Sequence, residues 1–78
     1  MEPQRAEKAA RFSEVLKQML QTRSIPESAE AVCAHLRREG EHLHVHTVRE
    51  ILRGRRFPRA ATREALFRAL GATTVERH

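Results

Sequence analysis

Arginine is the residue type whose number and spacing in this chain point most directly to a chemistry. Seven arginines and two glutamates lie between positions 49 and 68, a net formal charge of +5. The 78-residue chain as a whole also carries +5, so its other residues balance to zero. A planar guanidinium donates two parallel hydrogen bonds to a phosphate or to a guanine edge. Positive charge concentrated on one segment therefore predicts a surface that binds a polyanion.

The composition also has a second explanation. The chain holds thirteen arginines, two lysines, and no Asp or Asn. A GC-rich coding bias produces the same arginine excess, and life at high temperature disfavours Asn. Composition alone therefore identifies no function, and the positions of the arginines along the chain are more informative than their number.

Three histidines form the next chemical pattern. His42, His44 and His46 alternate with Leu43 and Val45. On an extended strand the three imidazoles would share one face, close to a metal-binding arrangement, whereas on a helix they would scatter. Because a helical pattern follows at once, we expect a polar turn or imidazoles that hydrogen-bond DNA, with no metal and no cofactor.

The residues that catalysis requires are missing. The sequence has no Asp, no glycine-rich phosphate loop and no metal-ligand spacing. Cys33 falls on an apolar stripe, and the adjacent His35 diverges from it by about 100° on a helix, so the two form no dyad. We expect Cys33 to be a small buried residue and the protein not to be an enzyme.

Length and composition limit the remaining classes. We expect one domain over residues 1–78 with frayed ends at 1–5 and 76–78. A core this small rarely supplies more than about 3–5 kcal/mol, so self-association would help it. No apolar run approaches the ~20 residues of a membrane span, the N-terminus is polar, and a single Cys forms no disulfide within the chain. Phe12, Phe57 and Phe67 are the only aromatic residues, too few for a base-stacking single-strand binder. These features predict a cytoplasmic protein.

Helical periodicity dominates the chain and predicts an all-α fold, a compact bundle of four to five helices. We expect helices from residue 3 or 6 to 22, from 26 to 39, from the 43–46 segment to 53, and from 60 to 70, with a final turn at 72–75. The positions expected to face the core are Phe12, Val15, Leu16, Met19, Leu20, Ala29, Val32, Cys33, Leu36, Val48, Ile51, Leu52, Ala65, Leu66, Ala69 and Leu70.

Glycine and proline mark the element ends. Gly40, Gly54 and Gly71 are placed to stop the last three helices, and Pro26 suits the first turn of the second. Residues 55–59 then form an arginine-rich connector, in which we expect one ring of the Phe57–Pro58 pair to enter the core.

These landmarks resemble a known family. The pattern Val48-x-x-Ile51-x-x-Gly54-Arg55-Arg56-x-Pro58, followed by Leu66-x-x-Ala69-Leu70-Gly71, is similar to the C-terminal half of a phage-repressor/Cro-type (lambda-repressor-like) helix-turn-helix domain. The resemblance covers residues 43–71 well and the first helix loosely. One departure lies upstream, because Gly40 stands eight residues before Val48, a longer connection than the family has.

The resemblance implies a sequence-specific double-stranded DNA-binding transcriptional regulator, a repressor type of phage or bacterial origin that binds as a homodimer. The helix around 44–53 would lie in the major groove. Residues implied to contact bases are His44, His46, Thr47, Arg49 and Glu50. Residues implied to contact phosphates are Arg53, Arg55, Arg56, Arg59 and Arg63.

Two other functions stay open at this point. An antitoxin-like or adaptor module would use the same helical fold to bind a protein partner. An RNA-binding helical domain is the other, although the low aromatic content does not favour it. Arg37 and Arg38 end the second helix, where their charge complements the helix dipole and needs no nucleic acid to explain it.

Overall fold

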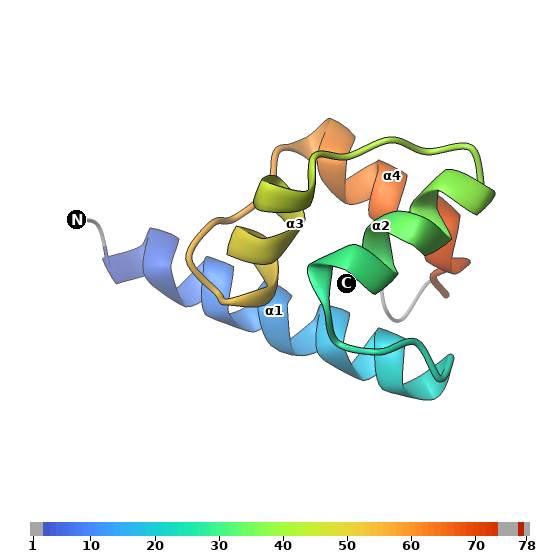
Figure 1. Ribbon diagram of the computed structural model, residues 1–78. Coiled ribbons are helices and arrows are strands. Elements are labelled where there is room, and N and C mark those ends of the chain that lie inside the picture. The colour runs from blue at the N-terminus through green and yellow to red at the C-terminus, as the bar shows by residue number, and fades with distance from the viewer. Residues whose placement is uncertain (1–2, 74–76, 78) are drawn as a thin grey trace.

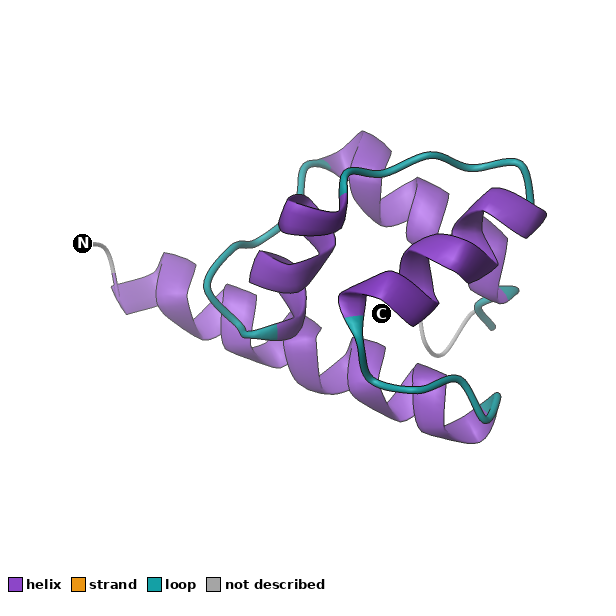
Figure 2. Cartoon of the chain, viewed as in Figure 1, coloured by secondary structure: helices purple, strands orange, loops and turns teal. Residues whose placement is uncertain are grey.

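The computed structural model describes residues 3–73 and residue 77, with side chains from Ala6 on. Four helices form the fold, α1 (Pro3–Thr22), α2 (Ala29–Arg38), α3 (Val45–Leu52) and α4 (Ala60–Leu70), and no described residue belongs to a strand. Figure 1 shows the long α1 along one side of the molecule, with the three shorter helices gathered against it. The all-α prediction is confirmed, and loops join the helices throughout (Figure 2).

One hydrophobic cluster occupies the space between the four helices. Apart from Val15, which is half-buried, every apolar position expected to face the core is buried. Phe67 is buried as well, at 8% exposure, although its position was not predicted. Burying a Leu, Ile or Phe side chain stabilises a protein by about 1.5–3 kcal/mol, so this cluster is the main source of stability.

All four helices end in the same way. In each, a residue just past the helix is in the left-handed region, and the next backbone N–H reaches back to close the helix. In α1, α2 and α3 this residue is the second after the helix, whereas in α4 it is the C-cap, Gly71. Glycine takes this position three times, as predicted, at Gly40, Gly54 and Gly71. After α1 the position belongs to Ser24, at φ +57°, and Ile25 N–H donates to Leu20 O at 2.9 Å. The break after α1 is therefore an ordered cap that orients the chain toward α2.

Some predicted boundaries were wrong. We expected α2 to begin at Pro26, but it begins at Ala29, because the Ser28 hydroxyl accepts a hydrogen bond from Ala31 N–H at 3.1 Å and caps the helix there. Arg53, expected inside α3, is its C-cap.

Near the chain ends, residues 3–5 and residue 77 are helical where we expected fraying. The rest of that expectation, for residues 1–2, 76 and 78, and residues 74–75 of the final turn lie outside the described part of the chain. No helix in the described part is both long and apolar enough to span a bilayer.

Polar side chains fasten the end of α4 to the other helices. The guanidinium of Arg23 donates from Nε to Leu70 O, from Nη1 to Met19 O at 3.0 Å, and from Nη2 to Gly71 O at 3.3 Å. It therefore joins the C-terminal carbonyl groups of α1 to those of α4. His35 Nε2 of α2 lies 3.0 Å from Ala69 O, which it contacts as a donor. Ala69, Leu70 and Gly71 stand at the C-terminal end of α4, where backbone carbonyl groups lack partners in the following turn, so these two side chains complete the end of α4.

We predict that Arg23→Met lowers the free energy of unfolding by about 1–3 kcal/mol, because it leaves helix-end carbonyl groups unsatisfied. For a domain of this size the midpoint of thermal unfolding should fall by about 4–8 °C per kcal/mol. Circular dichroism during heating measures it. The exposed Arg38→Met is the matched control and should stay within about 0.5 kcal/mol of the parent protein. Equal stability of the two variants would show that the Arg23 contacts contribute nothing.

Candidate nucleic-acid interface

The connection between α2 and α3 sets the position of the helix implied to contact DNA. Six residues, 39–44, join the two helices, against the three or four of a standard helix-turn-helix turn. Leu43 packs against the core, and the Cys33 thiol donates to Leu43 O at 3.6 Å. The extra length that the sequence indicated is therefore present, and it is held down on α2.

The histidine segment begins α3. His44 is the N-cap, and its Nδ1 accepts a hydrogen bond from His46 N–H at 3.1 Å. The His44 imidazole thus faces its own backbone, while the His46 side chain stays exposed. In the described residues no three potential ligands come together at one place, and the extended strand that would align the imidazoles does not form.

The two sides of α3 differ sharply. Val48 and Ile51 are fully buried and Leu52 is 8% exposed, so one side is sealed into the core. On the other side the residues implied to contact bases are exposed or half-buried. These residues are His44 and His46, which are exposed, and Thr47, Arg49 and Glu50, which are half-buried.

Arg49 is held by a carboxylate of the neighbouring helix. Its Nη2 donates to Glu30 Oε2 of α2 at 2.8 Å. A hydrogen bond at its own backbone, followed by the charge and hydrogen bond of Arg49, holds the pKa of the Glu30 carboxyl below its ordinary value of 4.5. Both side chains reach solvent, at 36% and 69% exposure. A surface pair of this kind is weak, so Arg49 can exchange Glu30 for a stronger acceptor.

Glu50 lies among the arginines that follow it. Its Oε2 is 3.9 Å from Arg53 Nη1 and 3.8 Å from Arg55 Nη1. At these distances the contacts are ion pairs without good hydrogen-bond geometry. Arg53 and Arg55 therefore remain more than half exposed at the surface, at 55% and 65%.

The connector and the starts of two helices enclose a hollow of about 320 Å³. Its lining residues come from α3, the connector and α4 and are Thr47, Arg56, Phe57, Pro58, Arg59 and Thr62. Arg56 and Arg59 are exposed, and no carboxylate of the described residues pairs with either. The α4 helix starts here with Arg59 as its N-cap and no side-chain cap. Uncapped N–H groups and two available guanidinium groups suit an anion.

A second hollow borders the other side of α3. It lies between α1, the start of α2 and the end of α3. It is lined by Lys17, Glu27, Ser28, Ala29, Glu30, Arg49, Leu52 and Arg53. Three cations and one capped helix N-terminus therefore face this hollow, together with two carboxylates. A hollow with arginines in its lining thus borders α3 on each side, and the arginines of the second hollow belong to α3 itself and its C-cap.

Two arginines of the charged segment make contacts within the fold. Arg63 donates from Nη1 to Pro58 O at 2.6 Å and lies 4.8 Å from the centre of the Phe57 ring, so it holds the connector in place. The structure places it away from the hollow at Thr47, although the resemblance implied a phosphate contact. Arg68 donates two hydrogen bonds to Glu41, at 3.1 and 3.3 Å, and ties α4 to the α2–α3 turn.

Sequence reasoning missed some of the residues that line the two hollows. Thr62 stands in the first turn of α4, and Lys17 reaches the second hollow from α1. The sequence contained a local signal that could have placed Thr62 at this hollow, because Thr62 follows the proline-closed connector by one helical turn. Lys17 had none, since only the packing of α1 on α3 brings it there. With the geometry established, we compared the chain with known proteins, and no family model, curated protein or solved structure matches it.

We predict that Arg68→Met raises the pKa of the Glu41 carboxyl toward its ordinary value of 4.5, because the hydrogen bond from Arg68 is the main cause of its lowering. A lowered carboxyl pKa stabilises the fold above the ordinary value, and this contribution is lost as the pH falls through the folded-state pKa. The variant should therefore lose less stability in acid. Carboxyl-carbon NMR titration measures the change, with Arg38→Met as control. An unchanged Glu41 pKa in the Arg68 variant would contradict the assignment.

Proposed function

We propose that the protein is a sequence-specific double-stranded DNA-binding regulator that places α3 in the major groove. The observation that carries the proposal is the arrangement around α3. One side of this short helix is sealed in the core, and the other is polar with arginine-lined hollows on both flanks. A recognition helix in a major groove needs this arrangement, because the phosphate backbones run along both of its sides. The resemblance to phage-repressor domains supports the same proposal.

In this proposal the first turns of α3 contact base edges. His46 and Thr47 are the first residues to reach the bases, because they stand at the start of the helix. Arg49 exchanges Glu30 for a guanine, to which a guanidinium donates two hydrogen bonds. Glu50 accepts from a cytosine amino group, and His44 contributes mainly by capping the helix that carries the others.

Phosphate contacts fall on the arginines that remain available at the surface. Arg56 and Arg59, beside the start of α4, are the principal ones. Arg53 and Arg55 add to them when their long contacts to Glu50 lengthen further. Arg63 acts indirectly, by holding the connector through Pro58 and Phe57. A regulator of this kind works in the cytoplasm by binding, without catalysis, and as a homodimer it would reach half-sites about 34 Å apart.

Selection from a random duplex DNA library at about 0.15 M salt tests the proposal, because that salt concentration suppresses part of the general attraction to phosphate. An enriched motif is the expected result, and two inverted half-sites would indicate a two-fold dimer. Binding that enriches no motif and disappears as salt rises would overturn sequence-specific recognition.

We predict different consequences for two arginine substitutions. Arg49→Ala should relax the preference at one base pair, at a cost of about 1–3 kcal/mol for the preferred base. Arg56→Ala should weaken binding to all duplexes alike and lower the slope of log affinity against log salt by about one unit. Fluorescence anisotropy with the selected duplex and its single-base variants, over a series of salt concentrations, measures both.

Arg38→Ala is the matched control for these two variants. Arg38 is an exposed arginine in the last turn of α2, and it lines neither hollow. Equal losses from Arg49→Ala and Arg56→Ala on every sequence would indicate general charge attraction. The role of α3 in recognition would then be wrong.

A further inference from the structure

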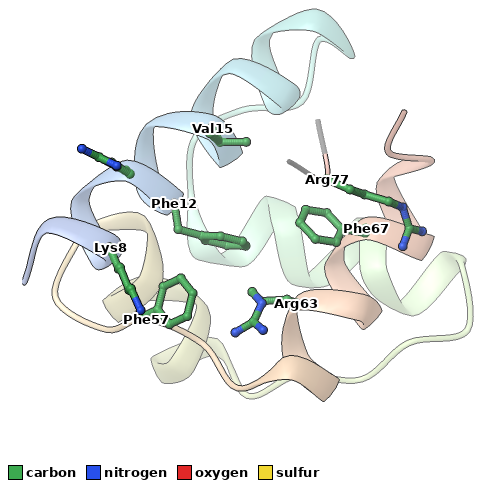
Figure 3. Close-up of a pocket in the computed structure, with 8 residues that line it drawn as sticks. Lys8, Phe12, Val15, Phe57, Arg63, Phe67 and Arg77 are labelled. Atoms are coloured by element: carbon green, nitrogen blue, oxygen red, sulfur yellow. The ribbon is translucent and has the colours of Figure 1, made fainter. Parts of the chain in front are cut away.

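A groove of about 430 Å³ lies between α1 and α4 and shares Phe57 with the hollow at Thr47 but no residue with the second hollow. Three phenylalanine rings come together in it (Figure 3), Phe12 from α1, Phe57 from the connector and Phe67 from α4. The other lining residues are Lys8, Arg11, Val15, Arg63 and Arg77. The proposed DNA contacts use none of the α1 residues in this groove.

The floor of the groove is apolar. Phe12 meets Phe57 edge to face, with ring centres 6.0 Å apart, and meets Phe67 at 5.9 Å in a tilted arrangement. Phe12 and Phe67 are largely buried, whereas Phe57 is 37% exposed and is the only large hydrophobic residue exposed among the described residues. Exposing a Phe to water beside two others is unfavourable, so covering this floor would be favourable.

The rim of the groove is cationic. Lys8 and Arg11 are exposed on α1, and no carboxylate of the described residues pairs with them. Arg63 lies over Phe57 and donates to a backbone carbonyl, and Arg77 pairs with Glu64 at 2.9 Å. None of the eight lining residues is acidic. Three of the four cations therefore have no carboxylate partner in the described part of the chain.

We propose that this groove binds an acidic amphipathic helical segment of a partner protein. Apolar side chains on one face of such a helix would cover Phe57 and the exposed parts of Phe12 and Val15. Carboxylates on both flanks of that face would pair with Lys8, Arg11 and Arg63. An amphipathic helix in an apolar groove is a common mode of peptide recognition, and the complementary charges select the acidic kind.

Two other occupants fit the groove less well. A second copy of this chain, paired through the same groove, would bring Lys8 and Arg11 close to cations of the same kind, which is repulsive. A single-stranded nucleic acid needs open ring faces on which to stack its bases. Arg63 already covers a face of Phe57 at 4.8 Å, and Arg77 covers a face of Phe67 at 5.4 Å.

The test uses the whole protein and three fluorescein-labelled synthetic peptides at about 0.15 M salt without DNA. The first peptide is a helix former with Leu at i, i+3, i+4 and i+7 and Glu on both flanks. The second replaces every Glu by Gln, and the third has the composition of the first in scrambled order. Fluorescence anisotropy should show binding of the first peptide, and at least about tenfold weaker binding of the other two.

Charge reversal locates the site. Lys8→Glu with Arg11→Glu should weaken binding of the acidic peptide by about tenfold or more. Arg37→Glu with Arg38→Glu makes the same change in net charge at the exposed end of α2 and should change the affinity by less than about twofold. Circular dichroism confirms that both double variants stay folded, and the Gln peptide provides the charge test without any substitution in the protein.

Four outcomes would overturn the proposal. The first is no binding of the acidic peptide at concentrations up to about 1 mM. The second is equal binding of the ordered and scrambled peptides, which would indicate bulk charge attraction. The third is a dimer in sedimentation equilibrium that only the Lys8 and Arg11 reversals disrupt, which would assign the groove to a second copy. The fourth is single-stranded DNA that displaces the peptide with the same sensitivity to those reversals. DNA is used only in the fourth of these measurements. A negative result for peptide binding at the groove therefore does not affect the proposed DNA-binding function of α3.

Discussion

The attachment of α3 to α1 is the contact on which the surface of this molecule depends. An isolated eight-residue helix is unstable in water, because helices shorter than about 12–15 residues are marginal even with favourable sequences. Here the Ser13 hydroxyl donates to Leu52 O at 2.6 Å in the buried interface. Gly54, at φ +73°, then turns the chain away with its backbone against α1. Because Val48 and Ile51 are also fully buried in the core, the polar side of α3 has a fixed direction.

Charge on this surface is matched more closely than the sequence indicates. The +5 of the 49–68 segment counts only carboxylates that are near in sequence. In the fold Glu30 reaches Arg49 from 19 positions away, and Glu41 reaches Arg68 from 27 positions away. In this segment Arg56, Arg59 and Arg63 pair with no carboxylate of the described residues, and Arg56 and Arg59 lie beside the uncapped start of α4. Under the proposed function, an approaching phosphate would meet this localised positive charge with weakly held cations around it, and geometry would contribute to selectivity as well as net charge.

Local signals predicted most of the fold and only part of the site. The end of every helix after the first was marked by glycine, and α4 matches its predicted range of 60–70, because its stop needs a left-handed residue. The start of α2 was wrong, because Pro26 and Ser28 are both acceptable starting signals and only the hydroxyl contact distinguishes them. The roles of Arg23 and Arg63 were missed altogether, because their acceptors are carbonyl groups that no side-chain pattern reveals.

The thiol of Cys33 lies under the α2–α3 turn, where it can serve as a probe of local motion. Cys33 is the only cysteine in the chain, it is buried, and its Sγ contacts the carbonyl of Leu43 in the α2–α3 turn. Burial raises the pKa of the Cys33 thiol above its ordinary value, so the reactive thiolate is rare in the closed state. A small thiol-directed reagent therefore reacts with Cys33 only when this turn separates from α2. Under conditions where closing outpaces labelling, the modification rate measures the free energy of that local opening separately from global unfolding. The modification rate of Cys33 thus reports the opening of the α2–α3 turn, which orients α3.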